Sequence, residues 1–177
     1  MQQLRGTLFQ YHPEKPHLVA FRSSAENVHG SSGSHRAHRA VVLLAGLTEG
    51  PLSLPFTVDL NQTLGERHWH LVQPVLSSSY TGFGIRSLEQ DTEELDQLLD
   101  GLFNSGYSRV VLLGHSTGSQ IALYYARFGR YRSRISGCLL QGAISDRQYY
   151  RHSMRETMTE EQMNAWLRMA EDMRKSR

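Results

Sequence analysis

The chain has 177 residues, a single cysteine and a formal net charge of +2, from 19 basic and 17 acidic side chains. This length suits one domain with a substantial core, and the scattered charges exclude a basic block suited to nucleic acid or to an anionic membrane. Cys138 has no partner for an internal disulfide, and residues 1–16 lack the apolar segment of a signal peptide. No apolar run is long enough to span a bilayer, so we expect a soluble, cytoplasmic protein.

Four segments of the first half have the character of β-strands. "LRGTLFQY" (4–11) and "HLVAFRS" (17–23) flank a turn with two prolines, which predicts an antiparallel hairpin. "AVVLLAGL" (40–47) is continuously apolar, as is typical of a strand buried on both faces of a parallel sheet. "HLVQPVL" (70–76) is a weaker strand, in which Pro74 predicts a bulge or a strand end.

Residues 23–39 predict a flexible loop, because they are rich in Ser, Gly and His and almost free of large apolar side chains. His29, His35 and His38 lie in this segment, but their spacing matches no standard zinc site and no cysteine assists them. We therefore expect no metal site here, and no cofactor elsewhere in the chain.

The second half alternates between helices and strands. Ser87 and Gln90 have the spacing of a capping box, and an amphipathic helix follows them. "RVVLLG" (109–114) predicts a buried strand, "QIALYYARF" (120–128) a helix and "ISGCLLQGAI" (135–144) a third buried strand. This order indicates a mostly parallel α/β sheet with right-handed connections. A second capping box, "TEEQ" (159–162), precedes a last amphipathic helix with this apolar stripe: Met163, Trp166, Leu167, Ala170 and Met173.

The pentapeptide "GHSTG" (114–118) stands between a predicted strand and a predicted helix, which is the setting of a nucleophile elbow. In such a turn Ser116 adopts a strained backbone conformation with its hydroxyl above the sheet, and the N–H of Thr117 faces a developing oxyanion. The competing interpretation is an ordinary glycine-rich turn. A phosphate-binding P-loop is excluded because Ser119, not lysine, follows the second glycine.

A second oxyanion donor is expected from the loop after the buried strand at 40–47. "LAGLTEGPLSLPF" (44–56) begins there, and the N–H of Leu47 is the candidate. A simple glycine-containing strand end is the alternative for this residue.

Four of these segments together resemble a family of α/β-hydrolases with a domain of unknown function, which includes fungal fusarinine-type siderophore esterases: "LAGLTEG", "SSSYTGFGIRSLEQDTEEL", "LGHSTGSQ" and "QGAISDRQYY". The resemblance runs from about residue 40 to beyond residue 150. It implies an α/β-hydrolase fold and ester hydrolysis by a Ser-Asp-His triad, with Ser116 as nucleophile and Thr117 and Leu47 as oxyanion donors. It also implies that residues 1–150 form the N-terminal part of the hydrolase core and that residues 151–177 begin a helical cap.

The triad histidine and acid are harder to find in the chain. They should follow the nucleophile in chain order, and the resemblance places them beyond Arg177. His152 is the one histidine after the elbow, but it stands where a cap should begin, and His115 is adjacent to the serine and points to the opposite side. Asp146 follows a core strand and is the candidate acid, with a helix cap or a salt bridge as the alternative role.

The predicted strand at 135–144 would be an unpaired apolar edge if the chain ended soon after it, which proteins normally avoid. We therefore expect a C-terminally truncated, incomplete α/β-hydrolase fold with an antiparallel hairpin at its start. Its expected function is hydrolysis of a small-molecule carboxylic ester through Ser116. The alternative is a catalytically silent hydrolase-like protein that binds a ligand or partner at its exposed apolar edge.

Overall fold

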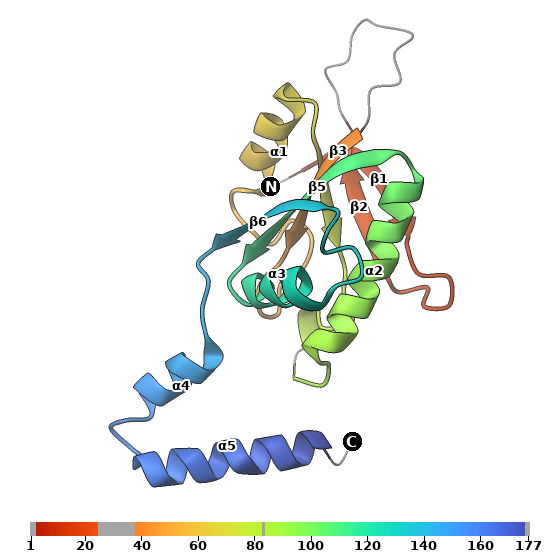
Figure 1. The fold of residues 1–177 in the computed structure, drawn as a ribbon. Coiled ribbons are helices and arrows are strands. Elements are labelled where there is room, and N and C mark those ends of the chain that lie inside the picture. The colour runs from red at the N-terminus through yellow and green to blue at the C-terminus, as the bar shows by residue number, and fades with distance from the viewer. Residues whose placement is uncertain (1–2, 25–37, 83, 176–177) are drawn as a thin grey trace, which may run out of the picture. The chain divides into compact units, whose positions relative to one another are not determined.

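The computed structural model describes residues 3–24, 38–82 and 84–175 (Figure 1). The predicted loop at 23–39 lies largely outside these ranges, and so do His29 and His35. Its two ends belong to strands, because Ser23 closes the second strand and His38 opens the third.

Six strands form one sheet in the order β1-β2-β4-β3-β5-β6. β1 and β2 pair in antiparallel fashion, as the two prolines between them predict, and β2 also runs antiparallel to β4. The remaining pairs, β4 with β3, β3 with β5 and β5 with β6, are parallel, which confirms the predicted sheet. The strands are β1 (Gly6–Gln10), β2 (Val19–Ser23), β3 (His38–Leu44), β4 (His70–Pro74), β5 (Tyr107–His115) and β6 (Ile135–Gln141).

Helices cover both faces of this sheet (Figure 1). The pattern predicts α2, α3 and α5, and the capping box at the start of α2 is present with both of its hydrogen bonds. It misses α1 and α4, whose apolar residues are too few to give a clear helical period. The helices are α1 (Thr57–Glu66), α2 (Leu88–Asn104), α3 (Thr117–Phe128), α4 (Asp146–Ser153) and α5 (Glu160–Lys175), with a short 3-10 turn η1 (Tyr80–Gly82).

The core has two layers, because alternate residues of the central strands point to opposite faces. Val42 of β3 packs with Leu98 of α2 and Ile121 of α3 in the larger cluster. On the other face Leu43 packs with Leu71 of β4, and α1 covers them. The continuous apolar run in β3 is therefore buried on both sides, as predicted.

β6 is the unpaired apolar edge expected for this segment, and it is less buried than the central strand β3. It lies at the edge of the sheet with β5 as its neighbour, and Leu139 and Leu140 are 57% and 41% exposed. The strand also ends at Gln141 rather than at residue 144. Apolar composition alone does not distinguish a central strand from an edge strand, because only the neighbouring strands and helices decide burial.

The chain divides into two compact units, Met1–Ala143 and Ile144–Arg177. The first holds the whole sheet, and the second holds α4 and α5. Thr159 and Gln162 make both reciprocal hydrogen bonds of the second predicted capping box before α5. Within the described ranges, every helix is too short or too polar to cross a bilayer.

A buried carboxylate ties three segments of the first unit together. Glu94 of α2 is 2% exposed, and it accepts hydrogen bonds from the Ser77 N–H at 2.8 Å and the Ser77 hydroxyl at 2.6 Å. Its other contact is the Lys15 ammonium at 3.1 Å, in the turn between β1 and β2. Charge-assisted hydrogen bonds of this kind are about twice as strong as neutral ones. Glu94 therefore fixes the start of the loop that follows β4.

We expect Glu94→Ala to lower the free energy of unfolding by about 3 kcal/mol, because it leaves the half-buried Ser77 donors and Lys15 without their buried acceptor. Its neighbour Glu93 is exposed, so Glu93→Ala should change stability by less than about 0.5 kcal/mol. Urea denaturation of both variants measures the difference. Equal losses in the two variants would contradict the structural role of Glu94.

A second acid on α2 is buried less favourably. Asp91 is 4% exposed, and its Oδ1 has no hydrogen-bond partner within the described structure. Burial raises the pKa of Asp91 from 3.8 to about 6. A hydrogen bond from Ser78 opposes this rise, and the nearby Glu94 charge adds a smaller increase. Between these pH values the folded chain keeps a proton that the unfolded chain releases, so Asp91 reduces stability as pH rises from about 4 to 6.

Asp91→Asn should remove this pH dependence, because the amide stays neutral. The variant should match the parent near pH 4 and exceed its unfolding free energy by about 2–3 kcal/mol at pH 7. Urea denaturation at several pH values tests this, and a difference that does not change with pH would contradict the assignment to Asp91.

Candidate functional site

Ser116 occupies a strained turn between the end of β5 and the start of α3. Its backbone angles are φ 52° and ψ −118°, a region that L residues seldom adopt. It stands at the N-cap position of α3, yet its side chain makes no capping hydrogen bond. Serine at this position normally uses its hydroxyl to satisfy the first helical N–H groups. Here the turn leaves the Ser116 hydroxyl uncommitted to the helix.

Two glycines make this turn sterically feasible. A Cβ atom at Gly114 would lie 2.5 Å from the Gly118 carbonyl oxygen, and a Cβ at Gly118 would lie 2.2 Å from the Leu44 carbonyl oxygen. Both distances are far below van der Waals contact with backbone atoms that cannot move aside. The start of α3 therefore packs directly against the ends of β5 and β3.

Hydrogen bonds hold the turn in place from both sides. The Ser119 hydroxyl donates to the Gly114 carbonyl at 2.9 Å, which joins the first turn of α3 to the end of β5. The Ser116 N–H donates to the Gln141 carbonyl at 2.9 Å, at the last residue of β6. The N–H of Thr117, the proposed oxyanion donor, opens α3, where the helix dipole favours negative charge.

The loop after β3 (residues 45–56, here the β3 loop) approaches Ser116 closely. A Cβ on Gly46 would lie 3.2 Å from the Ser116 Cβ and 2.8 Å from Glu49 Oε2, so the absence of a side chain permits the approach. Leu47, the second predicted donor, is the next residue, and its side chain is 43% exposed. The residue that precedes the Leu47 N–H therefore lies close in space to the nucleophile candidate.

Backbone strain gathers at this edge of the sheet. Thr48 (φ 60°) and Leu52 (φ 64°) lie in the β3 loop, Tyr80 (φ 54°) follows β4, and Ser116 follows β5. Each follows the carboxyl end of a parallel strand, where ligands bind in open α/β sheets. Strained residues of this kind cluster at functional sites, because the surrounding structure must hold them at a cost of about 1–3 kcal/mol each.

His115 is held away from the role of a base. Its Nδ1 forms a short hydrogen bond with Gln141 Oε1, and its Nε2 lies 3.8 Å from Glu49 Oε1. The Phe56 ring packs edge-on against the imidazole, with centroids 6.3 Å apart. With Nδ1 bonded to Gln141 and Nε2 facing Glu49, His115 links the β3 loop, the elbow and β6.

The other described histidines of the first unit are no better placed. His38 and His70 are the first residues of β3 and β4, and His68 precedes β4. They therefore lie at the amino ends of the parallel strands, whereas Ser116 lies at the carboxyl end of β5. His12 and His17 flank the turn before β2, which is three strands from β5, or about 14 Å at the usual strand spacing. The described part of the first unit therefore holds no histidine positioned as the base.

The remaining predicted site residues lie on α4 of the second unit. Asp146 is the first residue of this helix, after the Ser145 cap, rather than the end of a strand. The helix cap, one of the alternative roles expected for Asp146, is the preceding residue Ser145, whose hydroxyl accepts from the Gln148 N–H. His152 lies in the last turn of the same helix.

Two residues of the site escape prediction from the sequence. Glu49 and Gln141 are separated from the elbow along the chain, and no recognised motif names them. The spacing of Glu49 three residues after Gly46 is the signal that could have marked a local turn. The contact of Gln141 with His115 depends on the parallel register of β5 and β6, which the sequence does not specify.

The described residues offer neither a metal site nor an activated thiol as an alternative. The described residues contain no group of three or more His, Cys, Asp or Glu side chains placed to hold a metal ion. Burial raises the pKa of the Cys138 thiol, which disfavours the reactive thiolate.

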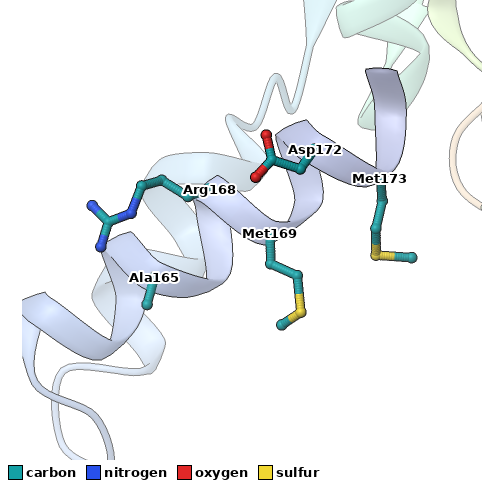
Figure 2. A pocket seen from close by; sticks show the side chains of 5 residues that line it. All are labelled: Ala165, Arg168, Met169, Asp172 and Met173. Carbon is teal, nitrogen blue, oxygen red and sulfur yellow. The ribbon is translucent and has the colours of Figure 1, made fainter. Parts of the chain in front are cut away.

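Figure 2 shows a shallow hollow on α5, with Met169 and Met173 on one side of the helix and Arg168 and Asp172 on another. A single helix forms it, so it lacks an opposite wall.

Comparison with known proteins agrees with this architecture. The family described as "Protein of unknown function (DUF1749)" matches residues 1–177. UPF0613 protein PB24D3.06c of Schizosaccharomyces pombe is 34% identical over 149 residues, covering 81% of this chain and 46% of that protein. Fusarinine C esterase sidJ of Aspergillus fumigatus is 30% identical over 139 residues, covering 64% and 39%.

Solved structures give the fold. The siderophore hydrolase EstB from Aspergillus fumigatus superimposes with a TM-score of 0.67 at 26% identity, covering 89% of this chain and 48% of that one. The chain thus has the α/β-hydrolase fold that its sequence motifs indicate. It spans less than half the length of each of these three proteins.

The close approach at Gly118 can be tested against a second helical glycine. We expect Gly118→Ala to lower the unfolding free energy by about 3 kcal/mol or more, because its Cβ would overlap the Leu44 carbonyl. Gly101→Ala in α2 meets no atom within 4 Å and should stabilise by about 0.5–1 kcal/mol. Thermal and urea denaturation measure the unfolding free energies of the two variants. Equal changes in both variants would contradict the close packing at Gly118.

Proposed function

Because the chain belongs to the DUF1749 family of proteins of unknown function, we propose that it is part of a serine hydrolase that cleaves a carboxylic ester through Ser116. The observation that carries the proposal is the Ser116 backbone, strained at φ 52° with its hydroxyl free of helix capping. Relatives named as a fusarinine C esterase and a siderophore hydrolase support ester hydrolysis as the reaction class.

In the proposed reaction the Ser116 oxygen attacks the ester carbonyl carbon while a base takes its proton. The carbonyl oxygen becomes an oxyanion, which the N–H groups of Thr117 and Leu47 stabilise. Collapse of this intermediate expels the alcohol, protonated by the base, and leaves an acyl group on Ser116. Water, activated by the same base, then releases the acid and restores the serine.

The proposed base is a histidine supplied from outside the first unit, with an acid to orient it. Asp146 remains the candidate acid, and it lies in the second unit. For residues 151–177 we propose the beginning of a helical cap. The exposed Trp166 and Met169 on α5 give that cap an apolar surface suited to an organic substrate. We further propose that the substrate is a small molecule and that the reaction takes place in the cytoplasm.

A fluorophosphonate reagent tests Ser116 directly, because it phosphonylates serines activated by an elbow and an oxyanion hole. With the purified chain we expect one adduct by intact mass, located on Ser116 by peptide mapping. Dissolved imidazole should speed the reaction at least about tenfold if it replaces the base that is absent from the described part of the first unit.

Ser116→Ala should abolish the adduct, whereas Ser133→Ala, an exposed serine in the loop before β6, should leave it unchanged. Modification that persists in Ser116→Ala would disprove the assignment. Absence of any adduct in a folded chain, with imidazole present, would favour the catalytically silent binding protein instead. If the parent reacts without imidazole, a loss of rate in His152→Ala would identify that histidine as the base.

A further inference from the structure

The β3 loop contains a tight turn closed by one side chain. The Glu49 N–H donates to the Gly46 carbonyl at 3.2 Å, and the Gly46 N–H donates to Glu49 Oε2 at 2.7 Å. This reciprocal pair encloses Leu47 and Thr48. The short distance to an ionised acceptor is typical of a charge-assisted hydrogen bond. The turn that carries the proposed Leu47 donor is thus held by the Glu49 carboxylate.

The same carboxylate reaches the elbow. Its second oxygen, Oε1, lies 3.8 Å from Nε2 of His115, the residue immediately before Ser116. The other imidazole nitrogen is bonded to Gln141 of β6, so His115 cannot rotate without losing that bond. Glu49 therefore connects the β3 loop to a side chain that is itself fixed, one residue from the nucleophile candidate.

The outer side of the turn is also anchored. The Tyr80 N–H donates to the Glu49 carbonyl at 3.4 Å, and the Tyr80 ring fills the space where a Gly50 Cβ would lie, 2.1 Å from Cζ. Thr48, within the turn, is β-branched and has a φ of 60°, which is costly for this residue type. A strained turn of this kind keeps its shape only while its contacts hold it.

We propose that Glu49 is a positioning residue, whose carboxylate fixes the Leu47 N–H relative to Ser116 by bonding Gly46 within the turn and approaching His115 across it. This inference rests on the function proposed above. Glu49 does not contact the reacting atoms in this arrangement, and it acts through Gly46 and His115. Since a negative charge near a developing oxyanion is unfavourable, hydrogen-bond acceptance rather than charge is the property that the turn requires.

Two variants of Glu49 separate hydrogen-bond acceptance from negative charge. Glutamine keeps an acceptor oxygen for the Gly46 N–H, whereas alanine removes it. We expect Glu49→Ala to slow phosphonylation of Ser116 by about 10- to 100-fold. This is less than the roughly 100- to 1000-fold loss on removal of one oxyanion donor, because the variant loosens the Leu47 N–H and does not remove it. Glu49→Gln should retain at least about a third of the parent rate. Glu66→Ala, an exposed glutamate at the end of α1, is the control and should react like the parent.

Amide hydrogen exchange at Gly46 supplies a readout that does not depend on the chemistry. It should quicken about tenfold or more in Glu49→Ala and stay near the parent value in Glu49→Gln, if the carboxylate closes the turn. Faster exchange together with slower phosphonylation, both restored by glutamine, is the expected result.

Two outcomes would overturn the proposal, and they differ from each other. If Ser116 reacts in the parent but Glu49→Ala reacts equally fast, Glu49 is not a positioning residue although the proposed function stands. If Ser116 of the parent does not react even with imidazole, the proposed function fails and the role of Glu49 fails with it.

Discussion

The close packing of the start of α3 against the ends of β3 and β5 is the constraint on which the candidate site depends. Gly118 touches the Leu44 carbonyl, and Gly114 touches the Gly118 carbonyl, so no side chain can be inserted at either position. This contact forces the chain to reverse sharply at Ser116 and leaves that residue in a conformation rarely occupied by serine. The uncommitted hydroxyl of Ser116 is therefore a consequence of helix and strand packing.

The same edge of the sheet shows how the strain is distributed. Strained residues follow three adjacent parallel strands. The Tyr80 N–H is bonded to Glu49 of the β3 loop, and the Ser116 N–H is bonded to Gln141 of β6. Glu49 joins the β3 loop to His115, while Glu94 holds Ser77 at the start of the segment that carries Tyr80. The two buried or half-buried carboxylates thus hold adjacent loops at the carboxyl ends of the parallel strands.

The sequence predicts the parts of this structure that have a local cause. The proline-flanked hairpin, the capping box at Ser87 and the two-sided burial of β3 follow from residue pattern alone. Features set by distant neighbours are not predictable in this way. α1 forms because its few apolar residues meet Leu43 and Leu71 on the sheet.

The residues of the candidate site likewise fall into those set by local sequence and those set by distant contacts. Ser116 and Thr117 are predictable because strand, turn and helix are contiguous in the chain. The role of Glu49 requires the β3 loop to meet the end of β5, and the contact of Gln141 requires the register of β6. The base shows the limit most clearly, because a histidine that completes a triad is recognised by its position in space.

The most direct test of the account is a crystal structure of the chain with a small phosphonate covalently attached to Ser116. The account predicts that the phosphonyl oxygen lies within about 2.7–3.1 Å of both the Thr117 and the Leu47 nitrogens. An oxygen that points to solvent, or a Leu47 N–H turned away from it, would contradict the assignment of this turn and loop as an oxyanion hole.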